Sequence, residues 1–120
     1  MKPVISKSVY NTLRNLILKF RTPEAKPLGE EIAKAEVVND DEIEKNVVSL
    51  GSFVEYKDDT ITRPIRMQIV LPEQADLAKR KVSVFAPISV ALIGFRESDI
   101  FKWKMPSGIK TLRILKVVNA

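Results

Sequence analysis

The chain has 120 residues, of which 45% are hydrophobic and 29% charged, with 20 Lys and Arg against 15 Asp and Glu. These values are typical of one globular domain, or of one domain with a small appendage. The absence of cysteine and histidine excludes disulfides and thiolate chemistry, and it removes the commonest general base and metal ligand. An enzyme is therefore less expected than a binding protein.

The hydropathy and charge patterns bear on location and partners. No window approaches the roughly 18 unbroken apolar residues of a membrane-spanning helix, and the start of the chain lacks the apolar segment of a signal peptide. We therefore expect a cytoplasmic protein without membrane contact. The net charge of +5 lies entirely in residues 46–120, because bases and acids balance in residues 1–45. This surplus favours an anionic partner only weakly.

The first part of the chain predicts a short antiparallel helical hairpin. Ser6 can cap a helix that begins at about Lys7 and ends before Pro23. A second, shorter helix is expected from about Leu28 to Glu36. The first helix has an apolar stripe of Val9, Leu13, Leu16, Ile17 and Phe20.

An acidic run follows the hairpin, from Asp40 to Glu44, and predicts a solvated linker over Asn39 to Lys45. The spacing of these acids matches no calcium loop, so no metal site is expected. We therefore divide the chain into a hairpin with its linker, residues 1–45, and a second domain, residues 46–120.

The segment from Lys81 to Gly94 is the longest nearly uncharged stretch, and its period changes in the middle. Val82 to Val84 alternates as a strand does. Pro87 then stands at a first-turn position of a helix, and Gly94 stands where a helix ends. We expect a strand that runs directly into a short buried helix.

The other segments with period two predict a mostly antiparallel sheet. Together with the hairpin and the short buried helix, this sheet makes the predicted fold class α+β. The expected strands are 53–56, 66–71, 101–104 and 111–117.

Five motifs occur in an order and spacing that resemble a known family. They are Val48–Val54, Ile69–Val70 followed by Glu73–Asp76, Val82–Ile88, Ala91–Gly94 and Pro106–Gly108. Together they resemble the C-terminal domain of the transcript-cleavage factors GreA and GreB, over roughly residues 47–118. The resemblance implies a fold similar to FKBP-type proteins. The family pattern has glycines where Ser89 and Ser98 stand.

The first part of the chain looks most like the short-armed branch of this family, the regulator of nucleoside diphosphate kinase (Rnk). The resemblance implies binding to bacterial RNA polymerase at the rim of its secondary channel, without a cofactor. An exposed Phe85 would suit a hydrophobic anchor for a partner helix; the alternative, that Phe85 points into the core, stays open. The polymerase-binding residues that we predict are Asp76, Phe85, Ala86, Pro87 and Ile88.

The length of the hairpin bears on transcript cleavage. The long-armed factors carry acidic residues at the hairpin tip into the polymerase active site, where these residues help to hold a catalytic magnesium ion. The first helix expected here has about 14 residues and spans on the order of 20 Å, less than half of such an arm. The acids near the tip are Glu24, Glu30 and Glu31, with Lys26 among them and no Asp-x-x-Glu pair. The resemblance therefore implies a transcription regulator, not an enzyme, that occupies the channel rim without stimulating cleavage.

Two alternative functions stay open. The FKBP-like fold suggests a peptidyl-prolyl isomerase, but this hypothesis rests on fold analogy alone. A nucleic-acid-binding module is the other alternative. Because no aromatic platform interleaves the bases, we prefer a solvated basic face with weak electrostatic contact to DNA or RNA in a polymerase complex. The bases concerned are Lys79, Arg80, Lys81, Lys102, Lys104 and Lys110.

Overall fold

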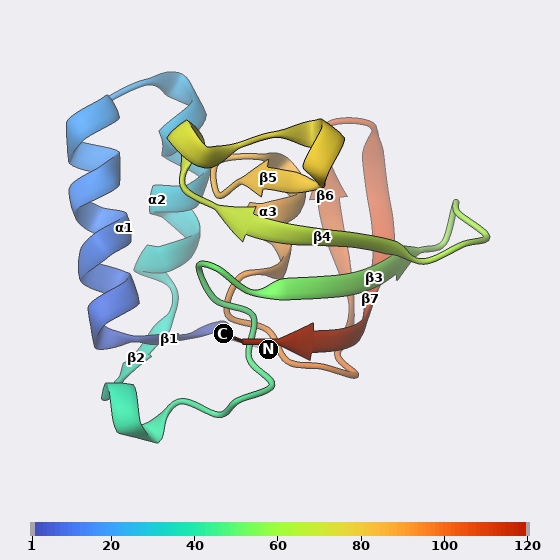
Figure 1. Ribbon diagram of the computed structural model, residues 1–120, viewed down its shortest axis with the longest axis horizontal. Coiled ribbons are helices and arrows are strands. Elements are labelled where there is room, and N and C mark those ends of the chain that lie inside the picture. Colours follow the sequence, from blue (N-terminus) through green and yellow to red (C-terminus); the bar gives the residue numbers. More distant parts are fainter. Residues whose placement is uncertain (1, 120) are drawn as a thin grey trace.

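The computed structural model describes residues 2–119 and has the mixed α+β fold that the sequence predicts. Helices α1 (Lys7–Phe20) and α2 (Lys26–Ala33) stand as a hairpin at one end of the sheet (Figure 1). The turn between strands β3 (Phe53–Asp58) and β4 (Ile65–Val70) projects from the opposite end. The molecule measures 37 × 31 × 26 Å along its principal axes.

Local capping explains where α1 begins and ends. The hydroxyl of Ser6 accepts a hydrogen bond from the Val9 N–H at 3.4 Å, which satisfies one of the free donors of the first turn. At the other end Arg21 adopts a left-handed conformation (φ 43°) and its N–H donates to Ile17. The predicted helix is therefore confirmed, with 14 residues.

Helix α2 begins and ends earlier than the predicted range 28–36. A 3₁₀ turn, η1 (Pro23–Ala25), leads directly into it, and Pro27 stands in its first turn. Proline is tolerated there because first-turn N–H groups have no partner within the helix. Glu36, which we placed in the helix, instead starts strand β2 (Glu36–Val38).

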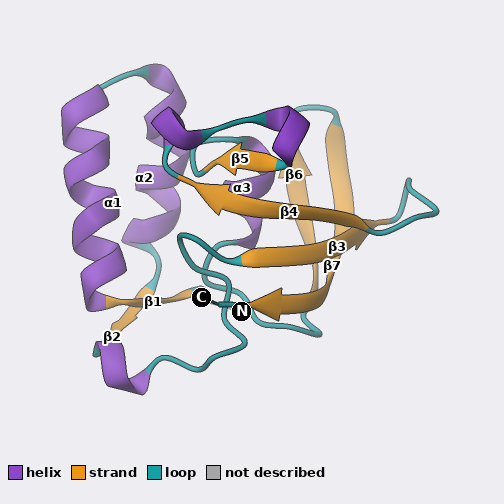
Figure 2. Cartoon of the chain, in the orientation of Figure 1, coloured by secondary structure: helices purple, strands orange, loops and turns teal. Residues whose placement is uncertain are grey.

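The main sheet has five strands in the order β5-β4-β3-β7-β6. Strand β5 runs parallel to β4, whereas the other neighbours pair antiparallel, so the sheet is mostly antiparallel as predicted. The 3₁₀ turns η3 (Pro72–Gln74) and η4 (Leu77–Lys79) connect β4 to β5 (Figure 2). The remaining strands are β5 (Lys81–Ser83), β6 (Ile100–Met105) and β7 (Gly108–Val118).

The change of period after residue 81 is confirmed. Strand β5 is followed by helix α3 (Pro87–Leu92), whose first residue is the proline that we expected there. Residues 89–92 of this helix are buried. Gly94 lies two residues beyond its end, with φ +87°.

A second, two-stranded sheet was not predicted. Strand β1 (Val4–Ser6) pairs in parallel with β2 and so ties the start of the hairpin to its end. Next to it, the Val4 N–H donates to the Gly94 carbonyl at 2.8 Å, and the Gly94 N–H donates to the Val48 carbonyl at 2.8 Å. Gly94 therefore joins the start of the chain, the segment before β3 and the end of α3.

One buried cluster joins the hairpin to the sheet. Because the cluster draws residues from both parts of the chain, residues 1–45 and 46–120 share a core, and the domain boundary at residue 45 stays a prediction. Its most deeply buried members include Leu13, Leu28, Ile69, Leu92, Leu112 and Ile114.

Substitution of Gly94 tests this junction. A Cβ at Gly94 would lie 2.5 Å from Pro3 Cβ and 3.0 Å from the Val4 nitrogen, and the positive φ adds backbone strain. We expect Gly94→Ala to lower the free energy of unfolding in urea by about 2 kcal/mol or more. Gly51→Ala is the matched control, because Gly51 has a similar φ of +89° with open space around it. Equal losses in the two variants would contradict a role for close approach at Gly94.

A second prediction concerns the turn after β3. Thr60 donates to Asp58 from its backbone N–H (2.7 Å) and its hydroxyl, and Lys110 lies 3.6 Å away. The hydroxyl bond is the main cause of the lowered pKa of the Asp58 carboxyl. Since the folded-state pKa lies below the unfolded value, the stabilisation is present above that value and is lost as the pH falls through the folded pKa.

We therefore expect Asp58→Asn to be less stable than the wild type at about pH 6, with a smaller difference at about pH 3. Urea unfolding at the two pH values measures this difference. Asp59→Asn is the control, because the described residues give the Asp59 side chain no hydrogen bond. A difference between Asp58→Asn and wild type that is independent of pH would contradict the assignment.

Candidate functional site

The turn between β5 and α3 contains the residues that the sequence analysis singled out. Phe85 is half-buried, and its ring meets the ring of Phe20, the last residue of α1, edge-on with centroids 5.7 Å apart. Ala86 is half-buried and Pro87 is exposed. Phe85 therefore fits neither alternative in full, because its side chain is neither fully buried in the core nor fully exposed.

A groove of about 560 Å³ opens beside this turn, and we call it the Phe85 groove. Helix α2 forms one wall and strand β6 forms the other, with the start of α3 between them. Its surface is mainly apolar, with glutamates on the α2 wall and lysines on the β6 wall. The lining residues are Pro27, Glu30, Glu31, Phe85, Pro87, Val90, Lys102, Trp103, Lys104, Met105 and Pro106.

The alternation of β6 explains the character of its wall. Lys102 and Lys104 are exposed, whereas Phe101 and Trp103 are half-buried on the opposite side of the strand. The Phe101 ring stacks at 4.4 Å on the buried Phe95, and the Trp103 ring lies 6.1 Å from Phe95. Such aromatic contacts hold the Trp103 side of the groove in place.

The three predicted tip acids lie in two different places. Glu24 lies in η1, at the turn of the hairpin. Glu30 and Glu31 lie in the second turn of α2, because this helix begins at Lys26, and both line the Phe85 groove. Glu31 also pairs with Lys34 at 3.4 Å.

Asp76 and Ile88, also predicted as partner-binding residues, do not line the Phe85 groove. Ile88 is half-buried and packs against the core. Asp76 precedes η4 and exchanges two backbone hydrogen bonds with Lys81, each 2.9 Å long. It lines a separate polar hollow of about 420 Å³ beside the edge of the sheet.

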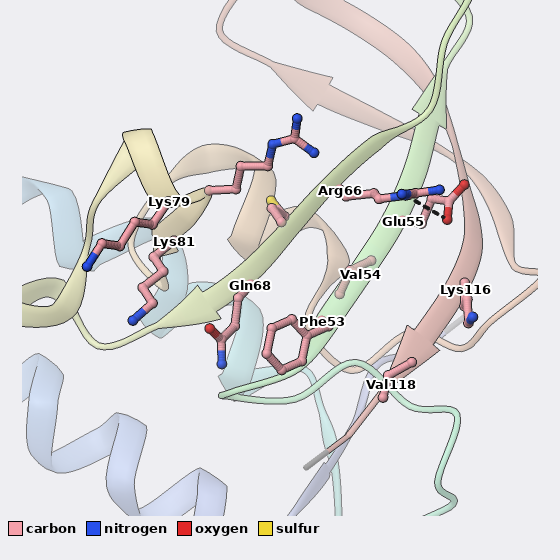
Figure 3. Close-up of a pocket in the computed structure, with 11 residues that line it drawn as sticks. Phe53, Val54, Glu55, Arg66, Gln68, Lys79, Lys81, Lys116 and Val118 are labelled. Carbon is pink, nitrogen blue, oxygen red and sulfur yellow. Dashed lines mark ion pairs between the residues drawn. The ribbon is translucent and has the colours of Figure 1, made fainter.

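The predicted basic surface also divides into separate places. Lys102 and Lys104 belong to the Phe85 groove, and Lys110 pairs with Asp58. Lys79, Arg80 and Lys81 instead border a hollow of about 740 Å³ on the face of β3 and β4 (Figure 3).

We call this second site the Phe53 hollow, because Phe53 lies in its centre with 49% of its surface exposed (Figure 3). Sequence analysis missed Phe53 as a site residue. The available signal was strand period: the buried Val54 and Tyr56 place Phe53 and Glu55 on the opposite face of β3. The other lining residues are Val54, Glu55, Arg66, Met67, Gln68, Lys79, Arg80, Lys81, Lys116 and Val118.

Ser89 and Ser98 stand at the two positions where the resemblance implies glycine. Ser98 has φ +76°, a conformation that favours glycine, and its N–H donates to Ile114 at 2.8 Å. Ser89 lies in α3 and is fully buried, and its hydroxyl has no hydrogen-bond partner among the described residues.

Among residues 2–119 no group of three or more acidic side chains is placed to hold a metal ion. No helix of the described chain is both long and apolar enough to cross a membrane.

Comparison with known proteins identifies relatives in transcription. Residues 43–119 match the family described as "Transcription elongation factor, GreA/GreB, C-term". The chain is 36% identical over 94 residues to the transcription elongation factor GreA of Syntrophotalea carbinolica, covering 78% of this chain and 58% of that protein. It is 32% identical over 88 residues to GreA of Thermotoga petrophila, covering 73% and 56%. The chain thus spans a little over half the length of these relatives.

Solved structures extend the likeness to the whole chain. The prokaryotic transcription elongation factor GreA/GreB from Nitrosomonas europaea superimposes with a TM-score of 0.76 at 30% identity, covering 99% of both chains. Gfh1 of Thermus aquaticus shares the fold, with a TM-score of 0.53 at 20% identity. The matched motifs, the sheet that carries them and the relatives agree: this chain belongs to the GreA/GreB family of transcription elongation factors.

Proposed function

We propose that this protein binds bacterial RNA polymerase at the rim of the secondary channel, uses the Phe85 groove as its docking surface, and does not stimulate transcript cleavage. Membership of the GreA/GreB family supports the choice of partner. The observation that carries the proposal is the position of the hairpin. Phe20, at the end of α1, packs against Phe85 in the turn between β5 and α3, and this turn forms one side of the groove.

The hairpin is short and held at both ends. Helix α1 has 14 residues, which corresponds to about 21 Å of helix. The β1–β2 pair fixes its base, and the Phe20–Phe85 contact holds the far end of α1 against the domain. An arm that reached into a polymerase active site would have to project away from the domain.

The charge at the turn of the hairpin also supports this proposal. Glu24 is the acid that lies in the turn itself, and Lys26 is two residues away. A second metal-binding carboxylate beside Glu24 is missing from the turn, since Glu30 and Glu31 face the groove. Short hairpin and sparse acids together favour assignment to the Rnk-like branch of the family.

The Phe85 groove has the features of a surface that accepts a helix. Its apolar floor includes Phe85 and Trp103, and aromatic side chains dominate many interfaces energetically. The walls carry opposite charges, with Glu30 on one side and Lys102 and Lys104 on the other. Opposite charges on the two walls would fix the orientation of an amphipathic helix that carries both signs.

Competition for core RNA polymerase tests the docking surface. We expect the protein to displace labelled GreB, and Phe85→Ala to weaken the displacement by about tenfold or more, as loss of an anchor residue does. Lys102→Glu with Lys104→Glu provides a second, exposed variant in which folding is not at risk, and we expect weakening there too. Phe53→Ala is the control with an aromatic residue removed elsewhere. No displacement by the wild type, or equal displacement by all variants, would contradict the docking proposal.

A stalled-complex assay tests the absence of cleavage. The wild-type protein alone should leave the nascent transcript intact, and in excess it should slow cleavage stimulated by GreB, because the two occupy one site. The Phe85→Ala variant should slow it less. Shortening of the transcript by the wild type alone would contradict the argument from hairpin length.

A further inference from the structure

We propose that the open face of the sheet binds single-stranded nucleic acid, with Phe53 as the platform on which a base stacks. The binding surface comprises the Phe53 hollow and the next row of side chains along β3 and β7, which we call together the Phe53 face. It shares no lining residue with the Phe85 groove, so the inference does not depend on the proposed polymerase docking.

Strand register places the side chains of this face in rows. Residues paired across antiparallel strands point to the same side of a sheet, and those two positions apart along a strand do so as well. Val54 and Tyr56 are buried on the core side, so the residues that alternate with them point outward. The rows are Lys81-Gln68-Phe53-Val118, then Arg66-Glu55-Lys116, then Lys57-Arg113.

The charge of this face is strongly one-sided. Glu55 is the acid among its residues, and it pairs with Arg66 at 3.4 Å. No other base of the face forms an ion pair among residues 2–119. Lys57 and Arg113 stand directly opposite each other, and both line a small hollow at the end of the face that Asp58 and Asp59 also line. The bases of the face are Lys57, Arg66, Lys79, Arg80, Lys81, Arg113 and Lys116.

The centre of the face is apolar and accessible. Phe53 is 49% exposed and Val118, its neighbour across β7, is 47% exposed. Figure 3 shows the Phe53 ring between Gln68 and Val118, with Lys81 beyond Gln68 and Arg66 against Glu55 farther along the face. An exposed ring inside a basic surface can stack a base while the surrounding cations contact phosphates. This arrangement is the aromatic platform that was not recognised in the sequence.

An acidic protein segment would satisfy the same cations, but the geometry favours a nucleic acid. A carboxylate-rich peptide gains little from an exposed phenyl ring, whereas every base has a flat π-face that stacks on one. Arg66, with 72% of its side chain exposed, adds a second planar group one row along the sheet from Phe53, where it pairs with Glu55.

Fluorescence anisotropy with the full chain tests the proposal. The probe is a labelled oligothymidylate of about 12 nucleotides, within the length that one small domain contacts. We expect binding at low salt, a loss of about tenfold in affinity for Phe53→Ala, and retained affinity for Phe53→Trp. Lys116→Gln should reduce the slope of log affinity against log salt by about 0.7. Lys45→Gln, with the same change of charge outside the face, is the control.

Three results would overturn the proposal. The first is no change of anisotropy with the wild type at low salt. The second is equal affinity for wild type and Phe53→Ala, which would show that attraction is electrostatic without stacking. The third is displacement of the probe by polyglutamate at the same concentration of charge, with polyglutamate binding also lost in Phe53→Ala; that result would assign the face to an acidic protein segment. Unfolding in urea verifies that each variant is folded.

Discussion

The close approach of the chain start to Gly94 is the constraint on which the rest of the structure depends. Gly94 accepts a hydrogen bond from Val4 and donates one to Val48, and Pro3 lies against the space where a side chain would stand. Glycine is favoured there because the positive φ strains any other residue and a Cβ would lie 2.5 Å from Pro3 Cβ. Through these contacts the start of the chain, the segment before β3 and the segment after α3 meet at one point.

The position of the functional surfaces follows from that junction. With β1 held beside Gly94 and paired with β2, helix α1 extends from a fixed base along the end of the sheet. Its last residue, Phe20, then reaches Phe85, and α2 becomes a wall of the Phe85 groove. The hairpin therefore helps to build the Phe85 groove, which a freely projecting arm would not do. The opposite, basic face of the sheet stays uncovered, because both longer helices lie at the end of the sheet.

Features that depend on local sequence could be predicted. Ser6 as a cap, Pro87 at the start of α3 and the period-two strands are local signals, and the structure confirms the elements that they predict. The β1–β2 pair could not be predicted, since three-residue strands carry no periodic signal and their pairing is decided by the distant Gly94. The predicted start of α2 at Leu28 was too late, because Pro27 is favoured in the first turn of a helix and lies inside α2.

Site residues were harder to predict because sites combine distant segments. Phe85 and Pro87 do line one groove, but its wall of Glu30 and Glu31 was assigned to the hairpin tip, since the register of α2 was shifted. Phe53 was treated only as a strand residue; its exposure among Lys81, Arg66 and Lys116 depends on strand pairing. The isomerase alternative gains no support from the fold, because Val54, Ile69 and Leu92 are buried members of the hydrophobic core.

The central proposal is that this family member binds at the rim of the polymerase secondary channel and does not stimulate cleavage, because its hairpin is short and packs against the domain. The most direct measurement is an electron cryo-microscopy structure of the full chain bound to core RNA polymerase. The account predicts a polymerase helix in the Phe85 groove, with Phe20 still against Phe85 and Glu24 well short of the catalytic magnesium ion. A hairpin detached from the domain with Glu24 at the magnesium ion, or a domain bound away from the channel rim, would contradict it.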